Sequence, residues 1–232
     1  RFYAPRPGDR WNRTSTYWLT FDSTAGLRMA AQSTPQAGQT THIAWMESAW
    51  QDDRVYDSLL PGPDDDHWFS GRLDANSPPI QATLSSALPF AAGDVRVTVK
   101  GSSTQPAALQ LAANGVTFEQ TTPPEKKPSG AHASDWSFDF TLPATEGNTE
   151  VAVQLNSNGA ALALEDVAWR APVTLDFKQK GAAFTSLPGM FTYQLQGVPA
   201  GAALYDVTDA MHPQIVTLSG ESQFSAGPAS RN

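Results

Sequence analysis

The sequence predicts an all-β protein, built as a jelly-roll-like β-sandwich with a smaller β-unit formed by the two chain ends. Three observations favour this fold class. The 232 residues include 17 Gly and 18 Pro, so few stretches are free of helix breakers. Short runs alternate between apolar and polar residues, which is the period of a half-buried strand. Turn residues separate these runs about every 8–12 residues, a spacing typical of sandwiches.

The first part of the chain contributes three predicted strands. Residues 14–21 (TSTYWLTF) are β-branched and aromatic and predict a strand, and residues 27–31 predict a second, short one. Residues 42–50 (HIAWMESAW) fit a helical turn and a strand about equally well. We interpret them as extended, followed by an acidic loop at Asp52 and Asp53.

The middle of the chain has the strongest strand patterns. In residues 94–100 (DVRVTVK) the valines at 95, 97 and 99 share one face, and polar residues occupy the other. Asn114-Gly115 is a hairpin turn signal. The other strands predicted here are residues 67–73, 81–84, 108–112, 116–118, 136–142, 150–155 and 162–169.

The spacing of the predicted strands along the sequence changes after Pro172. Residues 173–177, 190–196, 203–208 and 214–218 predict four more strands, with a turn of Asp and Pro before the last. We therefore predict a sandwich over residues 40–171 and a smaller β-unit from residues 1–39 and 172–232, whose strands pair with each other.

The composition of the chain disfavours several classes of function and partner. The net charge of −8 and the pI near 4.8 disfavour nucleic acid as a partner. With no cysteine, the chain has no disulfide, thiolate zinc site or cysteine nucleophile. No run approaches the roughly 18 apolar residues that span a bilayer, so we expect no membrane insertion. Because the chain starts at Arg1 rather than Met, we expect it to be a piece of a longer protein.

The densest polar cluster is PGPDDDHWFSGRL, residues 61–73. Calcium takes carboxylate oxygens in loops, so Asp64 and Asp66 are the candidate ligands of a structural calcium ion. The adjacent acids lack the alternating spacing of a dedicated calcium loop, and the alternative is a solvated acidic turn. Zinc is less favoured, because no two histidines stand four residues apart.

Other chemistry has weaker support. Glu47, Asp52, Glu165 and Asp166 offer carboxylates for a glycosidase, but the sequence does not place two of them face to face. No G-x-S-x-G elbow or phosphate-binding glycine loop is present. Seven tryptophans could stack on sugar rings, and we interpret most of them as core residues, including those at 68, 136 and 169. Trp50, beside an acidic loop, is the best exposed candidate for binding a glycan.

Three groups of residues resemble the leading region of gingipain-like cysteine peptidases, which are relatives of the type IX secretion sortase. They are YWLT at 17–20 followed by GLRM at 26–29, DHWF at 66–69 with Arg72-Leu73, and LYDVTD at 204–209 with Pro213. Their order and spacing match such a region over nearly the whole chain. In that family the catalytic His/Cys pair lies in a domain downstream, so no catalytic residue is carried over to this chain.

The resemblance implies a galactose-binding-like sandwich inserted in a split β-unit. It also implies a non-enzymatic accessory domain of a secreted or bacterial cell-surface peptidase, whose partner is the downstream peptidase domain of the same polypeptide. Two alternatives stay open: a carbohydrate-binding module, and a purely structural surface domain.

Overall fold

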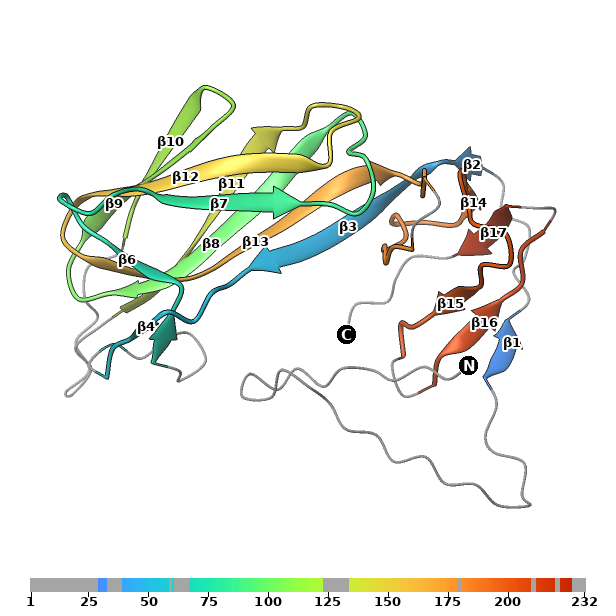
Figure 1. Cartoon of the computed structure of the whole chain (residues 1–232), viewed down its shortest axis with the longest axis horizontal. Coiled ribbons are helices and arrows are strands. Elements are labelled where there is room, and N and C mark those ends of the chain that lie inside the picture. The colour runs from blue at the N-terminus through green and yellow to red at the C-terminus, as the bar shows by residue number, and fades with distance from the viewer. Residues whose placement is uncertain are drawn as a thin grey trace, which may run out of the picture. The chain divides into compact units, whose positions relative to one another are not determined.

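The structure is a computed structural model, and it describes residues 29–32, 39–58, 60, 67–122, 134–178, 181–209, 212–219 and 222–226. Every regular element in this part of the chain is a strand, so the all-β prediction is confirmed. Figure 1 shows two compact units. One is Ile43–Thr185, and the other combines the described residues of Arg1–His42 and Ser186–Asn232.

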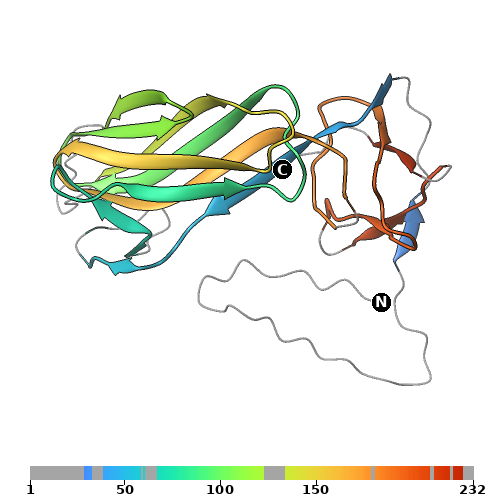
Figure 2. The ribbon, with the colours of Figure 1, turned by 45° about the horizontal axis from the view of Figure 1, so that its top comes forward.

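The larger unit is a sandwich of two antiparallel sheets, seen as two layers in Figure 2. The first sheet has the order β10 (Val116–Thr121), β9 (Ala107–Ala113), β12 (Glu150–Gly159) and β7 (Ile80–Ser85). The second has the order β11 (Ser134–Pro143), β8 (Asp94–Ser103), β13 (Leu162–Thr174) and β3 (Ile43–Trp50). The short strand β6 (Gly71–Leu73) also pairs with β13. The jelly-roll and galactose-binding-like details of the fold stay predictions.

The core lies between the two sheets and follows from the alternation of the strands. Val95, Val97 and Val99 of β8 are fully buried, as the DVRVTVK pattern predicts. Each such aliphatic side chain stabilises the fold by about 1.5–3 kcal/mol through its removal from water. The other strands contribute the same kind of side chain: Leu84, Leu109, Leu111, Leu142, Val153, Leu155, Leu162, Leu164 and Val167.

One strand boundary differs from the prediction. Residues 173–177 do not begin a new strand, because β13 continues through Pro172 to Thr174. The carbonyl of Pro172 accepts a hydrogen bond from Ala91 N at 2.9 Å, on the side of β13 away from β3. The missing N–H of proline points to that same side, so no bond to β3 is lost.

The smaller unit contains two three-stranded sheets. In one, β1 (Ala30–Gln32) pairs in parallel with β16 (Gln214–Val216), which pairs with β15 (Leu204–Asp206). In the other, β2 (Gln39–Thr41) pairs in parallel with β14 (Phe191–Gln194), which pairs with β17 (Gln223–Ala226). The two ends of the sequence therefore share both sheets. The strand predicted at residues 14–21 lies outside the described residues.

Candidate binding surfaces

A two-stranded hairpin covers the outer face of β13. The hairpin pairs β4 (Val55–Tyr56) with β5 (Trp68–Phe69). One residue further along, Asp57 N donates a hydrogen bond to His67 O at 2.9 Å. Because side chains alternate along a strand, one side of the hairpin is apolar and turned inward. The buried side chains of Phe69, Leu60 and Ala163 form a small second core there, with Val55 against it.

Tyr56 and Trp68, on the outward side of the hairpin, form an aromatic patch together with the ring of His67, the residue before Trp68. Tyr56 lies directly opposite Trp68 in the pairing, and their ring centroids are 5.3 Å apart. The Tyr56 ring is 5.9 Å from that of His67, and both contacts are tilted by 59°. Tyr56 is 55% exposed, the largest value among the large hydrophobic side chains of the described residues. The hairpin therefore presents an aromatic ring to solvent, and tyrosine is a residue type that is enriched at interfaces.

Two ion pairs include residues next to the aromatic patch along the chain, and we call these pairs its polar border. Arg72 Nη2 lies 3.2 Å from Asp57 Oδ2, and Arg54 contacts Asp52. Arg72 is about half exposed, whereas Asp57 is largely covered. In this part of the described chain, each of the two bases is matched by an acid.

The hydrogen bonds of His67 assign its tautomer when the ring is neutral. Its Nδ1 lies 3.0 Å from Leu60 O and 3.2 Å from Asp57 O. Both neighbours are carbonyl oxygens and can only accept, so Nδ1 carries the proton. The lone pair of the neutral ring is then on Nε2, which can accept a hydrogen bond.

A β-bulge in β13 places a buried carboxylate beside this hairpin. The register with β8 shifts between Leu164 and Asp166, so Glu165 is the additional residue, and it is only 3% exposed. Ser70 Oγ donates to Glu165 O at 2.5 Å and accepts from Asp52 N at 2.8 Å. Gln51 Nε2 donates to the Glu165 carboxylate at 3.4 Å. The bulge thus connects β13 to the loop after β3.

Trp50, the candidate sugar contact, is the last residue of β3 and lies opposite Val167. Cross-strand partners point to the same face of a sheet, and Val167 is fully buried. The Trp50 ring is therefore on the inner face, partly buried. Trp136 and Trp169 are core residues as predicted, but Trp68 is not, because it lies on the outward side of the hairpin.

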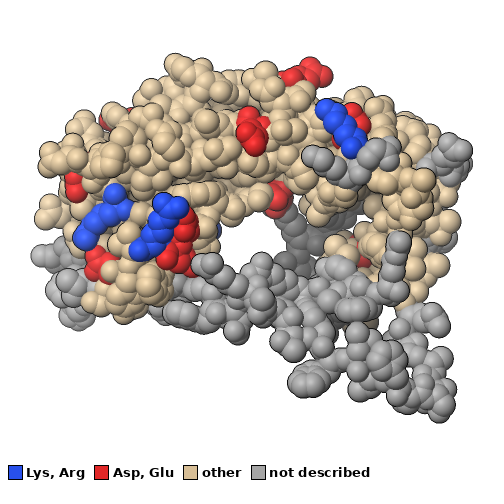
Figure 3. Space-filling view, viewed as in Figure 1, with Lys and Arg blue, Asp and Glu red and all other residues tan. Residues whose placement is uncertain are grey.

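The other carboxylates considered for catalysis form ion pairs. Glu47 Oε1 lies 3.1 Å from Arg170 Nε, and Asp166 Oδ2 lies 3.3 Å from Lys100 Nζ. The guanidinium of Arg170 also lies 4.6 Å from the centre of the Trp45 ring. Figure 3 shows basic side chains next to acidic ones on the surface, which is the expected appearance of such pairs.

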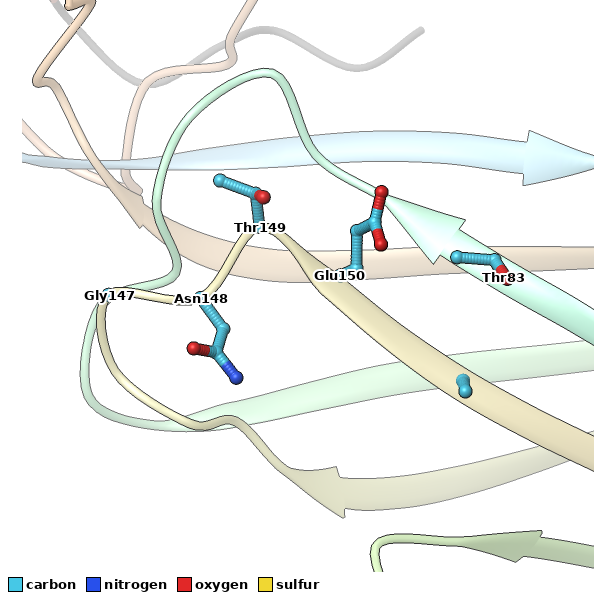
Figure 4. Close-up of a pocket in the computed structure, with 6 residues that line it drawn as sticks. Thr83, Gly147, Asn148, Thr149 and Glu150 are labelled. Carbon is cyan, nitrogen blue, oxygen red and sulfur yellow. The ribbon is translucent and has the colours of Figure 1, made fainter.

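A shallow, wide-open pocket of about 540 Å³ lies at the start of β12. In Figure 4 the Glu150 carboxylate lies between Thr149 and Thr83, while the Asn148 amide points the other way. Gly147 allows the preceding turn with its φ of +82°, and its N–H donates to Phe90 O at 3.0 Å. A single carboxylate among hydroxyl and amide groups provides no acid–base pair.

Asp64 and Asp66, the candidate calcium ligands, lie outside the described residues. Among the residues that are described, no three His, Asp or Glu side chains come together in a way that could hold a metal ion. The described chain also contains no helix with the length and apolar character needed to cross a membrane.

Comparison with known proteins identifies a structural neighbour. No protein-family model matches the sequence, and no curated protein matches it. The solved structures that match include one that superposes with a TM-score of 0.70 at 14% sequence identity, over 88% of this chain. It is PorU. The structure is that of dimeric latent PorU from Porphyromonas gingivalis, and this chain spans 21% of its length. At this identity the likeness to PorU establishes the fold, and the fold is that of one part of a much longer protein.

Proposed function

We propose that this chain is a non-enzymatic accessory β domain of a secreted or cell-surface gingipain-like peptidase. In this proposal it packs on the catalytic domain of the same polypeptide, or positions that domain. The observation that carries this proposal is the superposition on PorU, which covers 88% of this chain and 21% of the PorU chain. The motif groups at residues 17–29, 66–73 and 204–213 independently support the same family.

The chemistry of the chain agrees with a supporting role. It has no cysteine, so the nucleophile of a cysteine peptidase has to come from another domain. Glu47 and Asp166, two of the carboxylates considered for catalysis, are held in ion pairs with Arg170 and Lys100. The sandwich instead provides a rigid scaffold with large surfaces, the kind of structure that holds a neighbour in place.

The proposal is tested by producing this chain and the catalytic region of its parent polypeptide as separate proteins. We expect a one-to-one complex in size-exclusion chromatography with light scattering, and a higher melting temperature of the catalytic region when this chain is added. If the two proteins stay separate and melt independently, the chain is a structural spacer and the proposal fails. Turnover of a peptide or glycan by this purified chain alone would also contradict it.

A further inference from the structure

We propose that the aromatic patch of the β4–β5 hairpin binds a neutral saccharide, with one pyranose ring stacked on Tyr56. This inference goes beyond the accessory role and does not depend on it. It begins with the exposed ring of Tyr56, which is 55% accessible although the same hairpin buries Phe69 completely. A pyranose has a face of C–H groups and a rim of hydroxyls, so it matches an aromatic face that is bordered by polar groups.

The patch holds Tyr56 in a defined position. The residue is paired in the backbone with Trp68, and its ring contacts the rings of both Trp68 and His67. Below the hairpin, the small core of Leu60, Phe69 and Ala163 anchors both strands to the sandwich. An aromatic side chain with few accessible rotamers loses little entropy when a ligand stacks on it.

The polar border and His67 supply hydrogen-bonding groups near the aromatic patch. Arg72 contacts Asp57 through Nη2, and the guanidinium has further N–H donors that a sugar hydroxyl can use. The ring of His67 lies 5.9 Å from that of Tyr56, and Nε2 of the neutral His67 is an acceptor, because Nδ1 donates to backbone carbonyls. Donor and acceptor groups at the border suit hydroxyls, which both donate and accept.

Charge and size select this ligand class over others. Among the described residues of the border, Arg72 and Arg54 are each paired with an acid, so neither offers an unpaired cation to a phosphate or a uronic acid. A stable protein interface buries roughly 800 Å² on each partner, which takes about 20–30 residues, and the aromatic patch has three.

The test is affinity electrophoresis of the purified chain in native gels containing dextran, mannan, galactan or soluble β-glucan, with alginate as the anionic comparison. We expect at least one neutral polysaccharide to retard the native chain, and alginate not to. Tyr56→Ala should weaken this binding at least tenfold, while Tyr56→Phe keeps the ring and should bind within about threefold of the native chain. Met190→Ala removes an apolar side chain of similar exposure, 49%, from the smaller unit and should change nothing.

Three results would overturn the proposal: no retardation in any neutral gel, retardation in alginate alone, or equal retardation of Tyr56→Ala and the native chain. A dimer in light scattering that Tyr56→Ala dissociates would show that the aromatic patch is a protein interface instead. Because Tyr56 is exposed, melting temperatures within a few degrees of the native value verify that the variants are folded. Binding to the catalytic region is a separate measurement, so either proposal can fail alone.

Discussion

Trp136 lies across Gly101, its direct partner in the pairing of β11 with β8. A Cβ atom at residue 101 would stand 2.5 Å from Trp136 Cζ2 and 2.1 Å from the backbone oxygen of Ala163. The ring is buried, with 4% of its surface exposed, and the neighbouring oxygen belongs to β13. The absence of a side chain at Gly101 therefore allows three strands to approach at this position.

From this contact we predict that Gly101→Ala destabilises the sandwich by about 1–3 kcal/mol, because overpacking forces the ring or the backbone to shift. Urea unfolding followed by tryptophan fluorescence measures the loss. Gly181→Ala is the matched control, since a Cβ there would meet no atom within 4 Å. Equal stability of Gly101→Ala and Gly181→Ala would show that the close approach is not a constraint on the fold.

The bulge at Glu165 leads to a second prediction. Ser70 is buried, and its hydroxyl bonds both Glu165 O and Asp52 N. Ser70→Ala leaves these backbone groups without that partner, so we expect a loss of about 1–3 kcal/mol in the free energy of unfolding. Ser137→Ala, on an exposed position of β11, should change it by less than about 0.5 kcal/mol. A neutral Ser70→Ala would mean that water replaces the hydroxyl.

Tyr193 gives the smaller unit a dependence on alkaline pH. Its hydroxyl accepts a hydrogen bond from Leu187 N at 2.7 Å, its ring stacks on Phe224, and burial raises the pKa of the hydroxyl above 10. A raised pKa in the folded state gives stability that is complete below the unfolded pKa and is lost as pH rises through the folded one. We expect unfolding free energy to fall above about pH 10.

The variant Tyr193→Phe separates the two contributions of this side chain. It removes the acceptor of Leu187 N, so it should cost about 1–3 kcal/mol at pH 8. It also removes the ionisable group, so its further loss between pH 8 and pH 11 should be smaller than that of the native chain. Urea unfolding at both pH values tests this, and an equal alkaline loss in the two proteins would exclude Tyr193 as the cause.

Calcium binding by Asp64 and Asp66 is a prediction from the sequence. If the ion binds the folded chain, millimolar calcium should raise the melting temperature relative to EDTA, by mass action on the folded state. Asp64→Ala and Asp66→Ala should each abolish the rise, while Asp94→Ala, at the exposed start of β8, should preserve it. A melting temperature that is the same in calcium and in EDTA would show that Asp64 and Asp66 do not form a calcium site.

Strand positions could be predicted well where the pattern is local. The DVRVTVK alternation and the Asn114-Gly115 turn specify β8 and the β9–β10 hairpin from neighbouring residues alone. Prediction was weaker where a distant residue decides the outcome. The ring of Trp68 is turned outward because β5 is part of a hairpin whose other side covers Ala163, a residue far away in the sequence. Trp50 is turned inward because it pairs with Val167.

By itself, the sequence determined the all-β class, the positions of most strands along the chain, the absence of a thiol nucleophile and the acidic charge, because alternation, turn chemistry and composition depend on residues close together or on simple counts. Only the tertiary structure decided that β13 runs through Pro172, that Glu165 forms a bulge and that Tyr56 presents an exposed ring. Each of these depends on which strand lies beside another, and strand pairing is chosen by the packing of the whole sandwich.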